Sequence, residues 1–343
     1  MSADRPDVLD GARHPAEQTA LFGHAEAQAF LARSYRSGKG HHAILMEGPQ
    51  GIGKATLAFR FANHVLSHPE PLQAPETIAD PSPDSIVTRQ LVGGASHHLL
   101  HISRPADEKT GRLKSAITVD EVRKAGKFLA QTSGTGNWRI VIIDPADDLN
   151  RSAANAILKI LEEPPKRALF LVLTHAPGKL LPTIRSRCLP LSLSPLSSAD
   201  LASALESLGA MPSGARAGEV LDAAHGSVSQ ALKLVNYGGF DILEAFRTIV
   251  ASEKDAPRRD VHKLAEVLSA KDSDIVFGFF CQHVCDFVTD AARQAAQAGD
   301  LPRADRLAAL SSEIVERIGV AQAYNLDRKQ TIIGLLDDIR AAL

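Results

Sequence analysis

Three short apolar runs in the first half of the chain predict strands that are buried on both faces. They are residues 43–46, 139–143 and 169–173, and unbroken apolar runs of this length are typical of parallel sheets covered by helices. Apolar residues at helical spacing follow the first run, at 57–66, and separate the other two, at 157–161. Strands that alternate with helices in this way predict an α/β core built on a parallel sheet.

The rest of the chain has a different pattern. Residues 68–118 are rich in Pro, Asp, Ser and His and contain few periodic apolar positions, which favours an insertion or an extended connection. After Pro195 the apolar spacing is helical throughout, and residues 240–343 predict four or five amphipathic helices. The sequence therefore indicates an α/β part followed by a helical part.

A glycine-rich loop lies between the first predicted strand and its helix. Residues 48–56 read Gly-Pro-Gln-Gly-Ile-Gly-Lys-Ala-Thr, and a strand, a loop of this kind and a helix in that order predict a phosphate-binding loop. Its backbone N–H groups and helix dipole would hold phosphate oxygens. The residues expected to contact the nucleotide here are Gly48, Gly51, Gly53, Lys54, Ala55 and Thr56. A hydroxyl for Mg²⁺ is missing at Ala55, and Thr56 faces elsewhere on the helix.

A second element of the predicted site is Asp144, which ends the central apolar strand. Ligands of open α/β sheets collect beyond the carboxyl ends of the strands, so we expect Asp144 beside a nucleotide and its metal. Asn150 or Ser152 then caps a helix that Pro164 and Pro165 end. Two further aspartates between strand and helix, Asp147 and Asp148, are expected to cap or solvate the chain.

Several segments resemble the clamp-loader AAA+ subunits of bacterial DNA polymerase III. They read GPQGIGK at 48–54, ANAILKILEEPP at 154–165, LPTIRSRC at 181–188 and YNLDRK at 324–329, so the similarity covers nearly the whole chain. The resemblance implies an α/β P-loop AAA+ core, a small helical lid and an all-helical collar. The expected division is a flexible leader at 1–19, the core at 20–195 with its insertion at 68–118, the lid at 196–237 and the collar at 238–343.

The family implies roles for two more residues. Arg187 matches the arginine finger, which reaches the nucleotide of a neighbouring subunit, and a planar guanidinium that keeps its charge suits phosphate oxygens. Thr174 stands where the family has its first sensor residue. The alternatives are that Arg187 pairs with a local carboxylate and that Thr174 is only a polar strand end.

Three supports of catalysis are altered together. Ala55 replaces a hydroxyl, Pro145 stands where the family has glutamate after the strand aspartate, and Ser229 stands where active relatives carry a sensor arginine. Three losses at one site, with the outward-reaching Arg187 kept, predict a subunit that completes a neighbour's active site and does not hydrolyse ATP itself. ATP or ADP with Mg²⁺ is therefore expected to bind weakly or not at all.

The resemblance implies a stator subunit that supports ATP-driven loading of the sliding clamp on primed DNA. Its expected partners are motor subunits of the gamma/tau type, the delta subunit and, through the assembly, the clamp and DNA. One alternative is an active motor-type clamp-loader ATPase, which the intact Lys54 favours. Another is a structural module that keeps nucleotide as a ligand, which Lys54 with Asp144 would allow.

Composition restricts these possibilities further. A net charge of −2 lacks the strong basic excess of a protein that grips DNA alone, so we expect DNA contacts to be shared with partners. Three cysteines suit a reducing cytoplasm, and we predict no signal peptide and no stretch near the length of a membrane span. The insertion at 68–118 has no cysteine, and its histidines lack acidic or thiolate company, so we expect no zinc.

Overall fold

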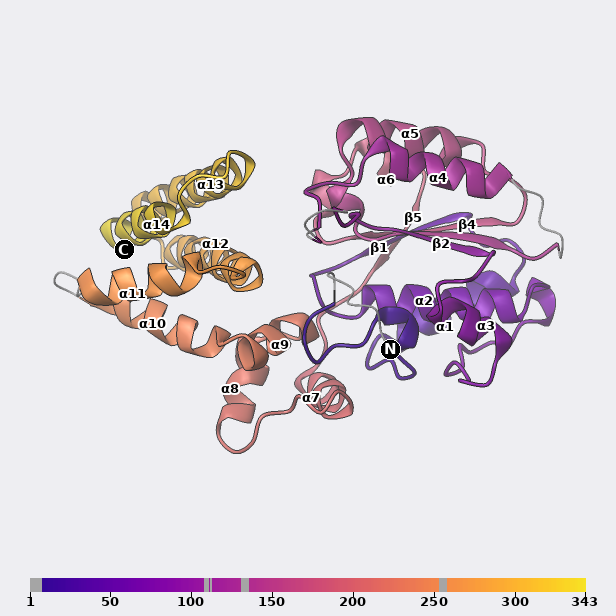
Figure 1. Cartoon of the computed structure of the whole chain (residues 1–343), viewed down its shortest axis with the longest axis horizontal. Coiled ribbons are helices and arrows are strands. Elements are labelled where there is room, and N and C mark those ends of the chain that lie inside the picture. Colours follow the sequence, from indigo (N-terminus) through magenta and orange to yellow (C-terminus); the bar gives the residue numbers. More distant parts are fainter. Residues whose placement is uncertain (1–7, 108–110, 112, 131–135, 253–257) are drawn as a thin grey trace. The chain divides into compact units, whose positions relative to one another are not determined.

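The computed structural model describes residues 8–107, 111, 113–130, 136–252 and 258–343 (Figure 1). The chain splits into two compact units, Met1–Ala231 and Leu232–Leu343. Within the described residues the first unit contains a sheet covered by helices, and the second is built from helices alone. This is the predicted fold class, an α/β core followed by a helical region.

The sheet of the first unit has five parallel strands in the order β2-β3-β4-β1-β5. The strands are β1 (Ala43–Glu47), β2 (Leu99–Ile102), β3 (Arg139–Ile143), β4 (Ala168–Thr174) and β5 (Leu189–Ser192). The three predicted strands are confirmed as β1, β3 and β4, and they form the centre. The two edge strands were not predicted. One of them, β2, lies in the segment that we expected to be an insertion, so this part of the segment belongs to the sheet.

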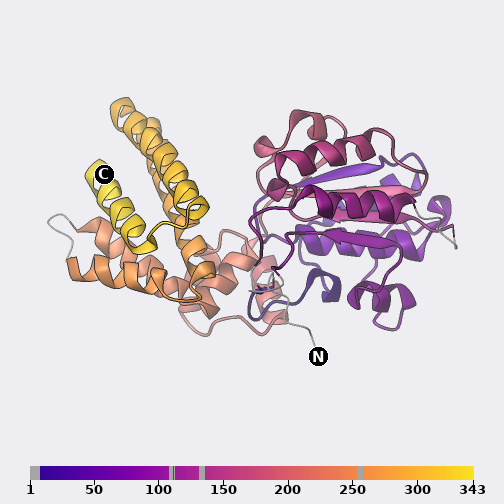
Figure 2. The same cartoon turned by 45° about the horizontal axis from the view of Figure 1, so that its top comes forward.

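Helices cover both faces of the sheet (Figure 2). Helices α1, α2 and α3 lie on one face, and α4, α5 and α6 lie on the other. Their bounds, with the short 3₁₀ turns and the helices that follow, are η1 (Pro15–Glu17), α1 (Ala25–Arg36), α2 (Lys54–Ser67), η2 (Pro71–Gln73), α3 (Ile86–Val92), α4 (Val119–Ala130), η3 (Ala146–Asp148), α5 (Arg151–Glu162), η4 (Pro177–Lys179), α6 (Pro182–Arg185), α7 (Ser198–Ser207), α8 (Arg216–Ala223) and α9 (Val228–Asn236).

Alternation along the central strands explains the two layers. Neighbouring residues of β4 point to opposite faces, so Leu171 packs with α1 and α2 while Phe170 packs with α4 and α5. Every residue of β3 and β4 is buried, and fully burying one such apolar side chain stabilises the fold by roughly 1.5–3 kcal/mol. The Asn150 side chain caps α5 as expected, since its Oδ1 accepts from the N–H of Ala153 at 2.8 Å.

The described residues of the second unit form a bundle of five long helices, within the four or five that we expected. They are α10 (Gly239–Ala251), α11 (Arg258–Ser269), α12 (Asp274–Gln297), α13 (Leu301–Ala323) and α14 (Arg328–Ala342). Helix α12 has 24 residues and a mean hydropathy of 1.2 in its most apolar window, so by length and composition it could cross a membrane. We had expected no such stretch. Its apolar character has another source, because Phe280, Val284 and Val288 lie in the bundle core.

Candidate functional site

The glycine-rich loop runs from the carboxyl end of β1 to the first residue of α2. Its three glycines, Gly48, Gly51 and Gly53, have positive φ angles of 151°, 79° and 103°, which residues other than glycine rarely adopt. A Cβ on Gly48 would lie 2.4 Å from the carbonyl oxygen of Leu193. The loop therefore needs glycine for its backbone shape and for close packing against the chain after β5.

Lys54 is the first residue of α2, and its side chain turns back onto the loop. It is 4% exposed, and its Nζ donates to the carbonyl oxygens of Gly48 and Pro49, both at 2.6 Å. Burial lowers the pKa of Lys54 to about 8, against the opposing effect of Asp144 and Asp147. The positive charge thus lies at the site where we expected it, held by the loop's own carbonyl groups.

The remaining carbonyl groups of the loop also have partners. The Ser227 Oγ donates to the Gln50 oxygen at 2.8 Å, and the Val228 N–H donates to the Gly51 oxygen at 2.9 Å. The ring nitrogen Nε2 of His24 lies 2.7 Å from the Ile52 oxygen. Sequence reasoning missed these contacts, because Ser227 and Gln50 are 177 residues apart and neither belongs to a motif that pairs them.

The backbone of the loop can accept a phosphate group. Among the described residues, the backbone N–H groups of Gln50, Gly51, Ile52 and Gly53 have no protein acceptor, which suits phosphate oxygens. Ala55 offers no hydroxyl to a metal, and the described residues contain no group of three or more His, Cys, Asp or Glu able to hold one. The site therefore fits a phosphate better than it fits Mg²⁺.

Asp144 lies directly after β3, at the carboxyl edge of the sheet as expected. One of its carboxylate oxygens is 3.6 Å from the Nε2 of His101 in β2. The next residue is Pro145, which follows a cis peptide bond and offers no side-chain acceptor. The side chain of Pro145 therefore cannot polarise a water molecule beside Asp144.

Asp147 has a larger role than the sequence indicated. Its carboxylate accepts from the Oγ1 of Thr174 at 3.0 Å and from the backbone N–H groups of His175 and Ala176 at 2.8 and 3.0 Å. It therefore joins the turn after β3 to the end of β4 and holds the predicted sensor, Thr174, which is fully buried. No motif marks Asp147, since only the sheet brings the ends of these two strands together.

The neighbouring aspartate has a different environment. Asp148 pairs with the Nε of Arg104 at 3.0 Å. Burial raises the pKa of Asp148, Arg104 lowers it, and the charges of Asp147 and Asp144 raise it further. Three carboxylates thus lie close together at the carboxyl edge, near the charge of Lys54.

Arg187 follows α6 and is partly exposed. Its Nη2 lies 2.7 Å from a carboxylate oxygen of Glu162, and its Nη1 donates to the carbonyl oxygen of Thr183 at 3.0 Å. Neither partner belongs to the predicted nucleotide site of this chain. Arg187 thus pairs with a local carboxylate, which was the alternative to the arginine-finger role. Its role as an arginine finger stays a prediction.

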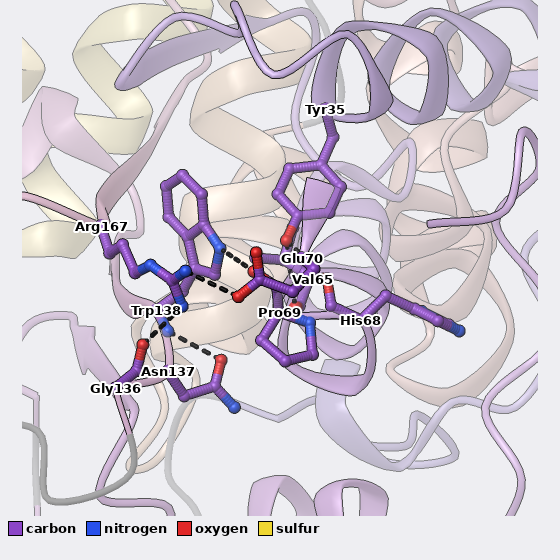
Figure 3. Close-up of polar contacts among 9 residues, drawn as sticks. All are labelled: Tyr35, Val65, His68, Pro69, Glu70, Gly136, Asn137, Trp138 and Arg167. Atoms are coloured by element: carbon purple, nitrogen blue, oxygen red, sulfur yellow. Dashed lines mark hydrogen bonds and ion pairs between the residues drawn. The ribbon is translucent and has the colours of Figure 1, made fainter. Parts of the chain in front are cut away.

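A second polar cluster lies at the amino ends of β3 and β4 (Figure 3). The Tyr35 hydroxyl donates to the His68 carbonyl oxygen at 2.6 Å, and the Trp138 Nε1 donates to that of Pro69 at 3.0 Å. Arg167 pairs with Glu70 at 2.7 Å. These bonds fasten the start of the predicted insertion to the edge of the sheet opposite the phosphate-binding loop.

A parallel five-stranded sheet, a phosphate-binding loop after β1 and an aspartate after β3 together define an AAA+ type core. Residues 23–197, about half of the chain, match the family model described as "DNA polymerase III, delta subunit". The chain belongs to this family. The predicted resemblance to clamp-loader subunits is thereby confirmed.

Individual relatives agree with the family. The chain is 36% identical over 147 residues to the DNA polymerase III subunit delta' of Pseudomonas aeruginosa, covering 43% of this chain and 41% of that one. It is 34% identical over 158 residues to the delta' subunit of Escherichia coli, covering 46% and 44%. The matched part thus spans less than half of these relatives. A DNA polymerase III gamma subunit-related protein of Thermotoga maritima aligns over 93% of this chain and 99% of its own, with 18% identity and a TM-score of 0.40.

Proposed function

We propose that this chain is the delta-prime stator of the DNA polymerase III clamp loader, which leaves ATP hydrolysis to a neighbouring motor subunit. In that role it supplies Arg187 to the neighbour's ATP site and supports loading of the sliding clamp on primed DNA in the cytoplasm. Its partners would be gamma/tau-type motor subunits and the delta subunit. The division into leader, core, lid and collar belongs to this proposal.

The observation that carries the proposal is the state of the chain's own nucleotide site. Lys54 is bonded to loop carbonyls, Ala55 and Pro145 lack the groups that hydrolysis needs, and Ser229 is turned against Gly51. Phosphoryl transfer depends on positioning and charge stabilisation by several groups at once. A site that lacks several of them is poorly suited to turnover of its own.

Arg187 retains what a finger requires. Its side chain is 35% exposed, and its ion-pair partner Glu162 is 48% exposed, so the pair is solvated and worth little to folding, roughly 0–1 kcal/mol. A phosphate group of a neighbouring subunit could replace Glu162 at small cost. The same planar fork that meets a carboxylate also meets phosphate oxygens.

The test is the DNA-stimulated ATPase of the reconstituted clamp loader with Arg187→Ala. Loss of an arginine finger in trans lowers the rate ~10³–10⁵-fold in related systems. We therefore expect a large fall in the rate of ATP hydrolysis at the affected site, while the complex still assembles. Arg185→Ala is the matched control, because Arg185 is a nearby exposed arginine of α6. Unchanged turnover with Arg187→Ala in an intact complex would remove Arg187 from the mechanism.

A motor-type ATPase is the second candidate, and one observation favours it. The loop N–H groups that have no acceptor among the described residues, together with the retained Lys54, are the parts that hold a phosphate. A nucleotide kept only as a structural ligand would use the same groups. Turnover by the isolated chain separates these possibilities.

A further inference from the structure

Residues 227–229 contact the phosphate-binding loop through two hydrogen bonds and close packing. The first bond runs from the Ser227 Oγ to the Gln50 oxygen and the second from the Val228 N–H to the Gly51 oxygen, at 2.8 and 2.9 Å. Ser227 is 4% exposed. Two successive residues, one through its side chain and one through its backbone, therefore donate to two successive loop carbonyls.

Gly51 permits this contact. A Cβ at this position would lie 2.0 Å from the Ser229 Oγ and 2.4 Å from the Ser227 Oγ, far inside van der Waals contact. Its φ of 79° also disfavours a side chain. The glycine is thus required by the serine turn, independently of any phosphate.

The other loop carbonyls are satisfied by the same unit of the chain. Lys54 donates to those of Gly48 and Pro49, and His24 contacts that of Ile52. Each carbonyl from residue 48 to residue 52 consequently has a protein partner. A backbone carbonyl that has a protein partner is satisfied without a ligand, so the chain's own groups hold the loop in shape.

We propose that the phosphate-binding loop of this chain has an internal ligand, the turn of residues 227–229, which we call the serine latch. The latch fastens the start of α9 to the sheet whether or not nucleotide is present. It rests on the proposed function, in which this site does not turn over ATP. Ser229, in place of the arginine that the resemblance leads one to expect, is small enough for the close approach to Gly51.

The test follows the backbone amides of Val228 and Gly51 in the full chain by NMR. The double variant Ser227→Ala/Ser229→Ala should speed hydrogen exchange of the Val228 amide roughly fivefold to tenfold, the effect of one lost hydrogen bond. It should also shift the amide signal of Gly51. Millimolar ATP with Mg²⁺ should leave Val228 exchange in the unaltered chain unchanged.

Ser207→Ala is the matched control. The Ser207 hydroxyl donates at 2.8 Å to the Ala204 oxygen within its own helix, α7, so its loss should alter neither Val228 nor Gly51. Faster exchange in α9 with an unmoved Gly51 signal would mean that Ser227 only caps the helix, and would overturn the latch. So would unchanged Val228 exchange in the double variant, or release of Val228 by ATP.

These outcomes are separate from the test of the proposed function. The clamp-loader assay alters Arg187 and measures turnover by the assembly, whereas the latch assay alters Ser227 and Ser229 and measures the isolated chain. A failed latch with a large Arg187→Ala effect would leave the stator role standing.

Discussion

Replacing Asp147 by alanine should destabilise the first unit more than any other single change among the three clustered aspartates. The variant removes the acceptor of three donors: the Thr174 hydroxyl and the N–H groups of His175 and Ala176. Thr174 is fully buried, so its hydroxyl loses a partner that water cannot easily replace, at a cost of about 1–3 kcal/mol. The two N–H groups belong to half-buried residues; that of Ala176 keeps the Thr174 Oγ1 as an acceptor at 3.2 Å and that of His175 can be partly rehydrated, so together they add about 1 kcal/mol.

The expected total is therefore about 2–4 kcal/mol. Asp148→Ala is the control, because the ion pair of Asp148 with the partly exposed Arg104 contributes about 0–1 kcal/mol. The two variants remove the same carboxylate from adjacent positions of one turn. A difference between them reports the bonds to the end of β4.

Urea unfolding followed by tryptophan fluorescence measures this difference. The chain has one tryptophan, Trp138, which packs on Tyr35 at a ring distance of 5.6 Å, so the signal reports the first unit alone. With a slope of roughly 2–3 kcal/mol per molar urea, Asp147→Ala should lower the midpoint by about 1 M. Equal midpoints for the Asp147 and Asp148 variants would refute the idea that Asp147 fastens the two strand ends.

Two further predictions concern proton binding and turnover. Burial lowers the pKa of His64 from 6.5 to about 4. Between these pH values the unfolded chain binds a proton that the folded chain does not. Acidification from pH 7 to pH 4 should therefore lower the free energy of unfolding by up to roughly 3 kcal/mol. The urea midpoint of His64→Gln should fall less steeply with pH; parallel curves would exclude His64 as the cause. The isolated chain, with and without primed DNA, should hydrolyse ATP no faster than Lys54→Ala, and turnover that depends on Lys54 would make it a motor subunit.

The sequence alone determined the centre of the sheet and the position of the loop. Strands β1, β3 and β4 are covered by helices on both faces, so their residues are apolar except at the strand ends, where Glu47, Arg139 and Thr174 stand. Glycines before a helix mark the phosphate-binding loop, because few other residues adopt its backbone angles. These features depend on neighbours in the chain, and so they can be recognised locally.

The edges of the sheet were decided by the tertiary structure. Strand β2 has four residues that are mostly half-buried, and β5 alternates between half-buried and exposed positions. Runs of four residues are too short for an apolar pattern to identify them as strands. Only pairing with β3 and β1 identifies them as strands.

The same division holds at the site. The residue types at Lys54, Asp144 and Arg187 could be recognised from the sequence, yet their partners could not. Hydrogen bonds from Ser227 to Gln50 or from Thr174 to Asp147 join segments that are distant in the chain, and no local pattern encodes such a distance. The sequence determined which chemical groups this protein carries, and the packing of the sheet and of the turn at 227–229 decided which of those groups meet.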